Sequence, residues 1–145
     1  MQKLELESEV IQISTYSNIV LSILNKHHEL SINKILFFAY LIKEEKYRLG
    51  KVYTANNKQD VVCKAISLIS GDYIEYCESI KFILKAIHLL INNRKIEING
   101  TIISRKNIIK HDEIMYQESA FIEKAIEESR KMSDKQFMKE VVANV

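Results

Sequence analysis

The sequence predicts a mainly helical α+β protein with one small β-hairpin. Apolar residues recur at helical spacing along most of the 145-residue chain, and two short β-rich runs flank the dipeptide Asn99-Gly100. With 47% hydrophobic and 28% charged residues, the composition is typical of a globular protein. A chain of this length normally folds around one core. We therefore expect a single domain over residues 1–145.

Helices are expected in the first part of the chain. Ser17 has the position of an N-cap for a helix that ends near Lys26, and residues 27–30 are expected to form a turn. Ser31 can cap a second helix, which places an apolar face toward a core. The residues of that face follow the i, i+3, i+4, i+7 spacing and are Ile35, Leu36, Phe38, Ala39 and Ile42.

The middle of the chain holds a short β-prone run at residues 52–54 and two more helices. The first of these helices is expected to begin at Asp60, and the second to extend from Asp72 to Asn92. Asn99-Gly100 follows, between the two β-rich runs. Because both central residues of a type I′ turn need positive φ, this pair predicts a hairpin.

C-terminal helices are expected over about residues 107–143. A helix of roughly 20 residues or more should end near Lys131. Ser133 and Gln136 have the spacing of a capping box, which predicts a last short helix with Phe137 and Val141 facing inward.

One apolar stripe of this C-terminal region admits two interpretations. It can pack into the core, which is the commoner explanation, or it can form a face for a partner helix or a second subunit. The residues of the stripe are Ile108, Met115, Ile122 and Ile126.

The expected order of elements over about residues 31–104 is helix, strand, helix, helix, strand, strand. This is the order of a winged helix, in which the hairpin is the wing and residues 52–54 supply the third strand. The helices on either side would pack on this body or project toward a partner. The expected fold is therefore a winged-helix-like body flanked by N- and C-terminal helices.

The motifs of common enzymes are missing, so we expect a protein that is not an enzyme. Phosphate loops of the GxxxxGK[ST] and GxGxxG types and the nucleophile elbow GxSxG are absent from the sequence, which excludes an ATPase within this chain. The acidic pairs Glu44-Glu45 and Glu127-Glu128 point about 100° apart on a helix, as on a solvated face. His27-His28 has no further ligands at a zinc-like spacing and is expected in a turn or a partner contact. We expect no cofactor and no metal ion.

The expected location is the cytoplasm, without membrane association. The chain has no apolar run of about 18 residues, and residues 1–10 lack the basic-then-apolar pattern of a signal peptide. Cys63 and Cys77 form no CxxC motif, which fits reduced thiols. Their apolar neighbours favour positions in or near the core.

Positive charge concentrates between residues 79 and 111, where seven basic residues stand against Glu97 alone. One group of polar residues shares a helix face opposite the apolar stripe, and a second group stands at the open end of the hairpin. In a winged helix, this helix can enter the DNA major groove and the second group can contact phosphates. The alternative is that these charges only keep the surface soluble. The candidate contacts to nucleic acid or a partner are Lys81, Lys85, His88 and Asn92 on the helix, and Arg94, Lys95, Arg105 and Lys106 at the hairpin.

Two stretches resemble a known family. Residues 19–30 (IVLSILNKHHEL) look like the N-terminal apolar helix and turn of the small middle components of bacterial three-component ABC/SMC-like ATPase defence systems of the Lamassu type. Residues 79–90 (SIKFILKAIHLL), leading into residues 96–100 (IEING), are similar to the long helix and hairpin of those proteins. The resemblance covers about residues 17–104. It implies a non-catalytic subunit that bridges an SMC-like, DNA-binding ATPase and an effector such as a nuclease.

Two functional hypotheses follow from these features. The first is an interaction subunit of an antiphage or anti-plasmid complex, with protein partners and with DNA reached through the complex. The alternative is a dimeric winged-helix transcription regulator resembling the multiple-antibiotic-resistance repressors. No arginine lies on the basic helix face to bind guanine, and the hairpin tip is uncharged, so the sequence offers little for direct base recognition. A purely structural or inhibitory phage or plasmid protein is a third possibility.

Overall fold

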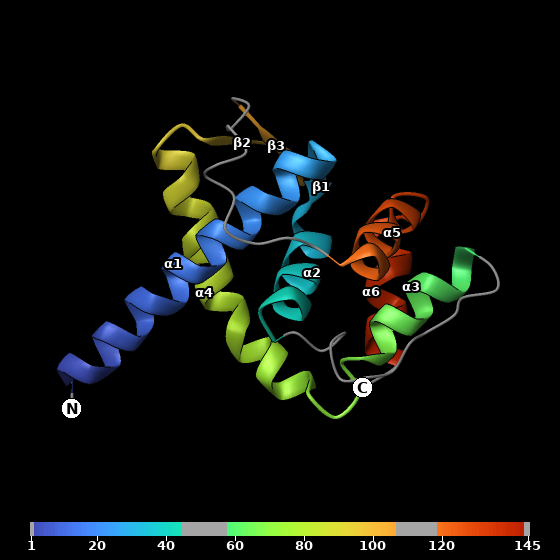
Figure 1. The fold of residues 1–145 in the computed structure, drawn as a ribbon, viewed down its shortest axis with the longest axis horizontal. Helices are drawn as coiled ribbons and strands as arrows, with labels where there is room; N and C mark the ends of the chain where they lie inside the picture. Colours follow the sequence, from blue (N-terminus) through green and yellow to red (C-terminus); the bar gives the residue numbers. More distant parts are fainter. Residues whose placement is uncertain (1, 45–57, 107–118, 144–145) are drawn as a thin grey trace.

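The computed structural model describes residues 2–44, 58–106 and 119–143. Helices dominate this part of the chain, and three short strands form a small sheet at one end (Figure 1). The α+β class is therefore confirmed, whereas the winged-helix-like arrangement stays a prediction. The elements are α1 (Gln2–His27), β1 (Glu29–Ser31), α2 (Ile32–Glu44), α3 (Lys58–Ser67), α4 (Tyr73–Asn92), β2 (Ile96–Asn99), β3 (Ile102–Arg105), α5 (Ala120–Ser129) and α6 (Asp134–Ala143).

The sheet is antiparallel and has the strand order β1-β3-β2. The third strand expected at residues 52–54 lies outside the described residues. A strand is instead formed by Glu29–Ser31, which was assigned to a turn and a helix cap. Leu30 pairs with Ile103, and both side chains are buried. A strand of three residues is too short to show an alternating pattern, so only its partner strand identifies it.

The hairpin is confirmed, but its turn differs from the expected one. Asn99 pairs with Ile102, so the two loop residues are Gly100 and Thr101. Gly100 has φ of 65°, whereas Thr101 is not among the residues with positive φ. Positive φ at the first loop residue alone defines a type II′ turn rather than type I′.

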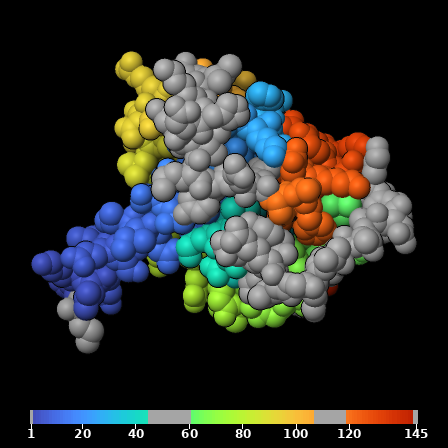
Figure 2. Space-filling view, viewed as in Figure 1, coloured from blue at the N-terminus to red at the C-terminus, as the bar shows by residue number. Residues whose placement is uncertain are grey.

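Helix α1 is longer than the sequence indicated. The expected cap at Ser17 is wrong, because the helix passes through this residue and the Ser17 hydroxyl donates to the carbonyl oxygen of Ile13 at 2.8 Å. A bond to the carbonyl oxygen four residues earlier satisfies the serine hydroxyl inside a helix, just as a bond to a free amide satisfies it at a helix cap. The first half of α1, from Gln2 to Ile13, extends away from the body (blue in Figures 1 and 2). The helix ends at His27, and His28 redirects the chain into β1 with φ of 70°.

Helix α2 lies at the centre of the core. Its expected cap is confirmed, since Ser31 Oγ accepts a hydrogen bond from the Lys34 amide at 3.4 Å. Helices α1, α4, α5 and α6 surround it, so it is buried on all sides and not along one stripe only. The Phe37 ring packs edge-to-face on Phe38, Tyr76 and Phe137, with centroids 5.3, 6.0 and 5.4 Å apart.

The helices after residue 58 follow the expected order with different limits. Helix α3 begins at Lys58, so the expected start at Asp60 is wrong by a few residues. Helix α4 matches the expected span, with Asp72 at the N-cap position after Gly71, whose φ is 88°.

The described C-terminal residues, 119–143, form two short helices, so the first is shorter than the expected long helix. Helix α5 starts after Ser119, which has an extended backbone and accepts a hydrogen bond from the Ile122 amide at 3.1 Å. The expected continuous helix of about 20 residues is therefore wrong. The cap at Ser133 is confirmed, because its hydroxyl accepts from the Gln136 amide at 3.1 Å. Phe137 of α6 is buried as expected.

Candidate partner-binding surfaces

Four of the predicted contact residues form what we call the α4 basic face: Lys81, Lys85, His88 and Asn92. All four are exposed, on the side of α4 opposite the buried Ile83, Ala86 and Leu90. The i, i+4, i+7, i+11 spacing placed them on one face, and the structure agrees. The face extends about 16 Å along the helix axis.

Contacts within the chain already engage much of this face. Lys85 forms an ion pair with Glu9 of α1. His88 Nε2 lies 3.1 Å from Asn92 Nδ2, and Lys81 Nζ lies 5.0 Å from the centroid of the Phe82 ring. A ligand that bound this face would have to compete with these interactions.

Three further residues form a hairpin-base cluster: Arg94, Lys95 and Lys106. The Lys106 amide donates to the carbonyl oxygen of Lys95 at 3.2 Å, which holds the two ends of the hairpin together. All three side chains are exposed, and Arg94 has φ of 60° in the tight connection after α4. Three exposed cations at the two ends of one hairpin favour an anionic partner surface.

Arg105 differs from the other predicted contacts. Its side chain is half-buried, and its guanidinium donates to Asn25 Oδ1 at 3.3 Å and to the carbonyl oxygen of Leu21 at 3.5 Å. Arg105 therefore ties the hairpin to α1, and its expected contact to nucleic acid or a partner stays a prediction.

The predicted partner-helix face is not a surface in the described part of the chain. Ile122 and Ile126 are both fully buried in the core between α5 and its neighbours. Ile108 and Met115 lie outside the described residues. Of the two interpretations of this stripe, the core explanation holds for Ile122 and Ile126.

A different apolar surface appears on the first half of α1. Leu4, Leu6, Val10 and Ile11 are 70, 62, 59 and 66% exposed. We call this segment, residues 2–13, the apolar arm. It was missed because a helix start at Ser17 was expected, although Leu6, Val10 and the buried Leu24 follow one helical stripe in the sequence.

A groove of about 400 Å³ lies where α1 crosses α4. Its walls are almost entirely apolar and come from Ile13 of α1 and Leu84 and Leu89 of α4, with Lys85 and His88 beside them. Leu84 and Leu89 are 44 and 46% exposed. The apolar arm and this groove are adjacent along the same helix.

His27 does not lie in a turn, as expected, but in the last turn of α1 with a buried ring. Its Nδ1 lies 3.0 Å from Glu127 Oε1, and Arg130 Nε lies 2.7 Å from Glu127 Oε2. Arg130 also donates to the carbonyl oxygen of His27. This cluster fastens α5 to the end of α1, so Glu127 is a structural carboxylate and not only a solvated one.

A lysine in the interior was not expected from the sequence. Lys34 of α2 is buried, and its ammonium donates to the carbonyl oxygen of Met132 at 2.7 Å, 4.0 Å from Asp134 Oδ1. Burial lowers the pKa of Lys34 from its usual value, and the nearby Asp134 carboxylate offsets part of this effect. Lys34 therefore connects α2 to the turn between α5 and α6.

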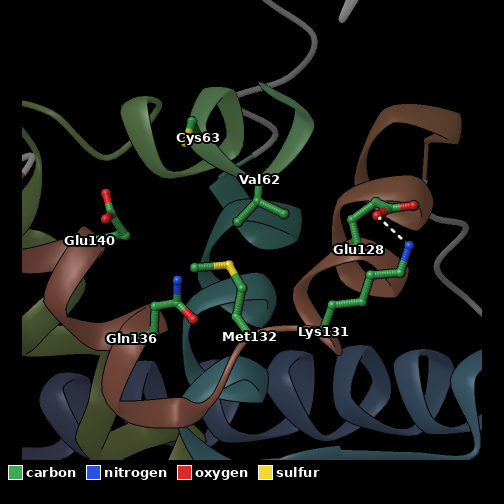
Figure 3. A pocket seen from close by; sticks show the side chains of 7 residues that line it. All are labelled: Val62, Cys63, Glu128, Lys131, Met132, Gln136 and Glu140. Carbon is green, nitrogen blue, oxygen red and sulfur yellow. Dashed lines mark ion pairs between the residues drawn. The ribbon is translucent and has the colours of Figure 1, made fainter. Parts of the chain in front are cut away.

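A pocket of about 420 Å³ opens between α3 and the α5–α6 turn (Figure 3). Glu128 and Lys131, paired at 3.1 Å, form one side of it, and Cys63 lies on the α3 side. Cys63 and Cys77 are both free and exposed, so the expected core or near-core positions are wrong.

Comparison with protein-family models, with curated proteins and with solved structures finds no match to this chain. None of the helices in the described residues is long and apolar enough to cross a membrane. Evidence on function therefore comes from the surfaces themselves.

Proposed function

We propose that this protein is a non-catalytic interaction subunit of a bacterial antiphage or anti-plasmid complex, bridging an SMC-like, DNA-binding ATPase and an effector. The observation that carries the proposal is the hairpin-base cluster, an exposed group of cations beside the α4 basic face. Such a surface suits an acidic macromolecular partner. The family resemblance of residues 17–104 supplies the kind of complex.

The sheet and the helix before it support a winged-helix-like body. Strand order β1-β3-β2 places the strand that precedes α2 beside the hairpin, and α4 leads directly into the hairpin. Three helices, α2, α3 and α4, lie between β1 and the hairpin. The expected order counts from a strand at residues 52–54, which lies outside the described residues, and the two helices expected between that point and the hairpin are α3 and α4.

The alternative is a dimeric winged-helix transcription regulator, favoured by the position of the α4 basic face just before the hairpin. This alternative is weakened because two of the cations that it needs already have contacts within the chain. Lys85 is paired with Glu9, and Arg105 holds α1. Affinity for the DNA backbone comes mainly from cations that neutralise phosphates, so the α4 basic face offers little affinity for DNA by itself. A protein partner at the hairpin base therefore fits better.

Co-expression with the neighbouring genes, followed by affinity purification, tests the proposal. We expect an ATPase to be captured, and we expect the loss of that ATPase when all three residues of the hairpin-base cluster are changed to Glu. A matched control reverses three exposed charges on α5 and α6, by Lys124→Glu, Lys135→Glu and Lys139→Glu, and should retain the ATPase. Both triple variants change the net charge equally, so a difference in ATPase capture between them reports the position of the reversed charges.

Two results would contradict the proposal. The protein could purify alone and capture no ATPase in co-expression. It could also bind its own promoter in a gel shift with high specificity and a steep dependence on salt, which would establish the regulator instead.

A further inference from the structure

The apolar arm needs a cover that the described part of the chain does not supply. Leu6 and Val10 on one face of the helix, and Leu4 and Ile11 on the opposite face, are each more than half exposed. Leu6, Val10 and Ile13 follow i, i+4, i+7 spacing, and the same stripe continues into the buried Val20 and Leu24. The stripe that packs the core of the protein thus extends into solvent, which is typical of an interface.

The arm and the groove beside it are complementary in shape and polarity. The arm is a single helix with aliphatic side chains, and the groove is a mainly apolar hollow of about 400 Å³. Ile13, which lines the groove, belongs to the same stripe as Leu6 and Val10. A helix laid against Ile13 therefore covers the groove together with these two side chains.

The charges of the arm and of the groove indicate which helix packs against Ile13. The arm carries Glu5, Glu7 and Glu9 against Lys3 alone, whereas α4 presents Lys85 and His88 beside the groove. Within one copy, Glu9 is already paired with Lys85. Each copy thus contains both an acidic apolar helix and a basic apolar groove. In a pair of copies, the arm of one copy can therefore meet the groove of the other.

Two identical arms can meet about a twofold axis near Val10. It sets the two α1 helices antiparallel, with Leu6 of each copy opposite Ile13 of the other. Glu5, adjacent to Leu6, then comes near Lys85 and His88 beside the other copy's groove. In such a closed, symmetric contact the same patch serves on both sides.

We infer that two copies of this chain form a symmetric dimer in which each apolar arm packs against the other copy's groove between α1 and α4. The inference does not rest on the proposed function, because the hairpin-base cluster lies outside the arm and the groove.

Analytical ultracentrifugation of the full chain tests the dimer. We expect twice the chain mass of 16.9 kDa at micromolar concentration. The double variant Leu6→Glu, Val10→Glu should sediment as a monomer, with the dissociation constant raised about 100-fold or more. Val142→Glu, at a 57% exposed position on α6, is the matched control and should remain dimeric. Far-UV circular dichroism checks that all variants retain their helices.

A cross-linking experiment tests the position of the axis. In a chain whose Cys63 and Cys77 are replaced by serine, Val10→Cys should form a disulfide between two copies under mild oxidation, because the two α1 helices meet at this residue. Val142→Cys in the same chain should not. A monomeric wild-type protein, or a dimer unaffected by Leu6→Glu, Val10→Glu, overturns the inference. A monomer that floats with lipid vesicles would assign the arm to a membrane surface and overturns it as well.

Discussion

The buried ammonium of Lys34 gives a prediction in which two opposing effects can be separated. Removing an ion of this kind from water costs several kcal/mol. Its hydrogen bond to the carbonyl oxygen of Met132 at 2.7 Å returns about 1.5–3 kcal/mol. Asp134, at 4.0 Å, adds a smaller attraction. Burial lowers the pKa of Lys34, which is the direction expected if the cost of burial exceeds this attraction.

Two substitutions at Lys34 should therefore have opposite effects. Lys34→Met keeps the aliphatic stem and removes the charge, so we expect the free energy of unfolding to rise by about 1 kcal/mol at neutral pH. Lys34→Ala also removes the stem, at about 0.8 kcal/mol for each lost methylene group, and should lower the free energy of unfolding by about 2 kcal/mol.

Urea unfolding followed by circular dichroism measures both values, and its pH dependence gives an independent check. A lysine whose pKa is lower in the folded protein than its usual 10.5 makes the unfolded chain bind more protons between the two pKa values. The stability of the wild type should therefore rise with pH in that window, relative to Lys34→Met. If Lys34→Met lowers the free energy of unfolding by more than about 1 kcal/mol, the hydrogen bond outweighs desolvation and the reasoning fails.

Three further predictions concern the core, the hairpin turn and alkaline pH. Phe137→Ala should lower the free energy of unfolding by about 3–5 kcal/mol, because it removes the ring contacts with α2. Val142→Ala on the same helix should change the free energy of unfolding by less than about 0.5 kcal/mol. Equal effects of the two substitutions in chemical denaturation would mean that α6 does not dock on α2. Gly100→Ala should cost about 1–2 kcal/mol, although no atom lies within 4 Å of the added Cβ, because φ of 65° strains an alanine; an unchanged urea midpoint would contradict the type II′ turn. The free energy of unfolding should also fall as pH rises above 10.0. Burial raises the pKa of Tyr16 to about 12 and also raises the pKa values of Tyr40 and Tyr76. Above pH 10.0 the unfolded chain therefore loses protons that the folded protein keeps. An absorbance titration in which all seven tyrosines ionise near pH 10.0 while the helices persist would refute this.

Local chemistry made much of the fold predictable. The span of α4, the caps at Ser31 and Ser133 and the hairpin at residues 96–105 depend on residues within a few positions of one another. The shared face of Lys81 and Lys85 likewise depends only on helical spacing. Such features need no knowledge of the rest of the molecule.

The errors arose where two local solutions had similar energies. Ser17 suits a helix cap, but its hydroxyl is equally satisfied by the carbonyl oxygen of Ile13 within a longer helix. Asn99-Gly100 can form a type I′ turn, but pairing of Asn99 with Ile102 selects the next two residues instead. In both cases the choice depends on what the neighbouring segments pack against.

The sequence by itself determined the class of the fold, the main helices, the hairpin and the location of the positive charge, because periodicity and turn chemistry act over a few residues. Only the tertiary structure decided that Glu29–Ser31 is a strand, that His27 and Lys34 are buried and Arg105 binds α1, and that the surplus apolar surface lies on α1 and not on Ile122 and Ile126. The physical reason is that burial depends on contacts between segments far apart in the chain. A cation or an apolar stripe has the same local pattern whether another element covers it or not.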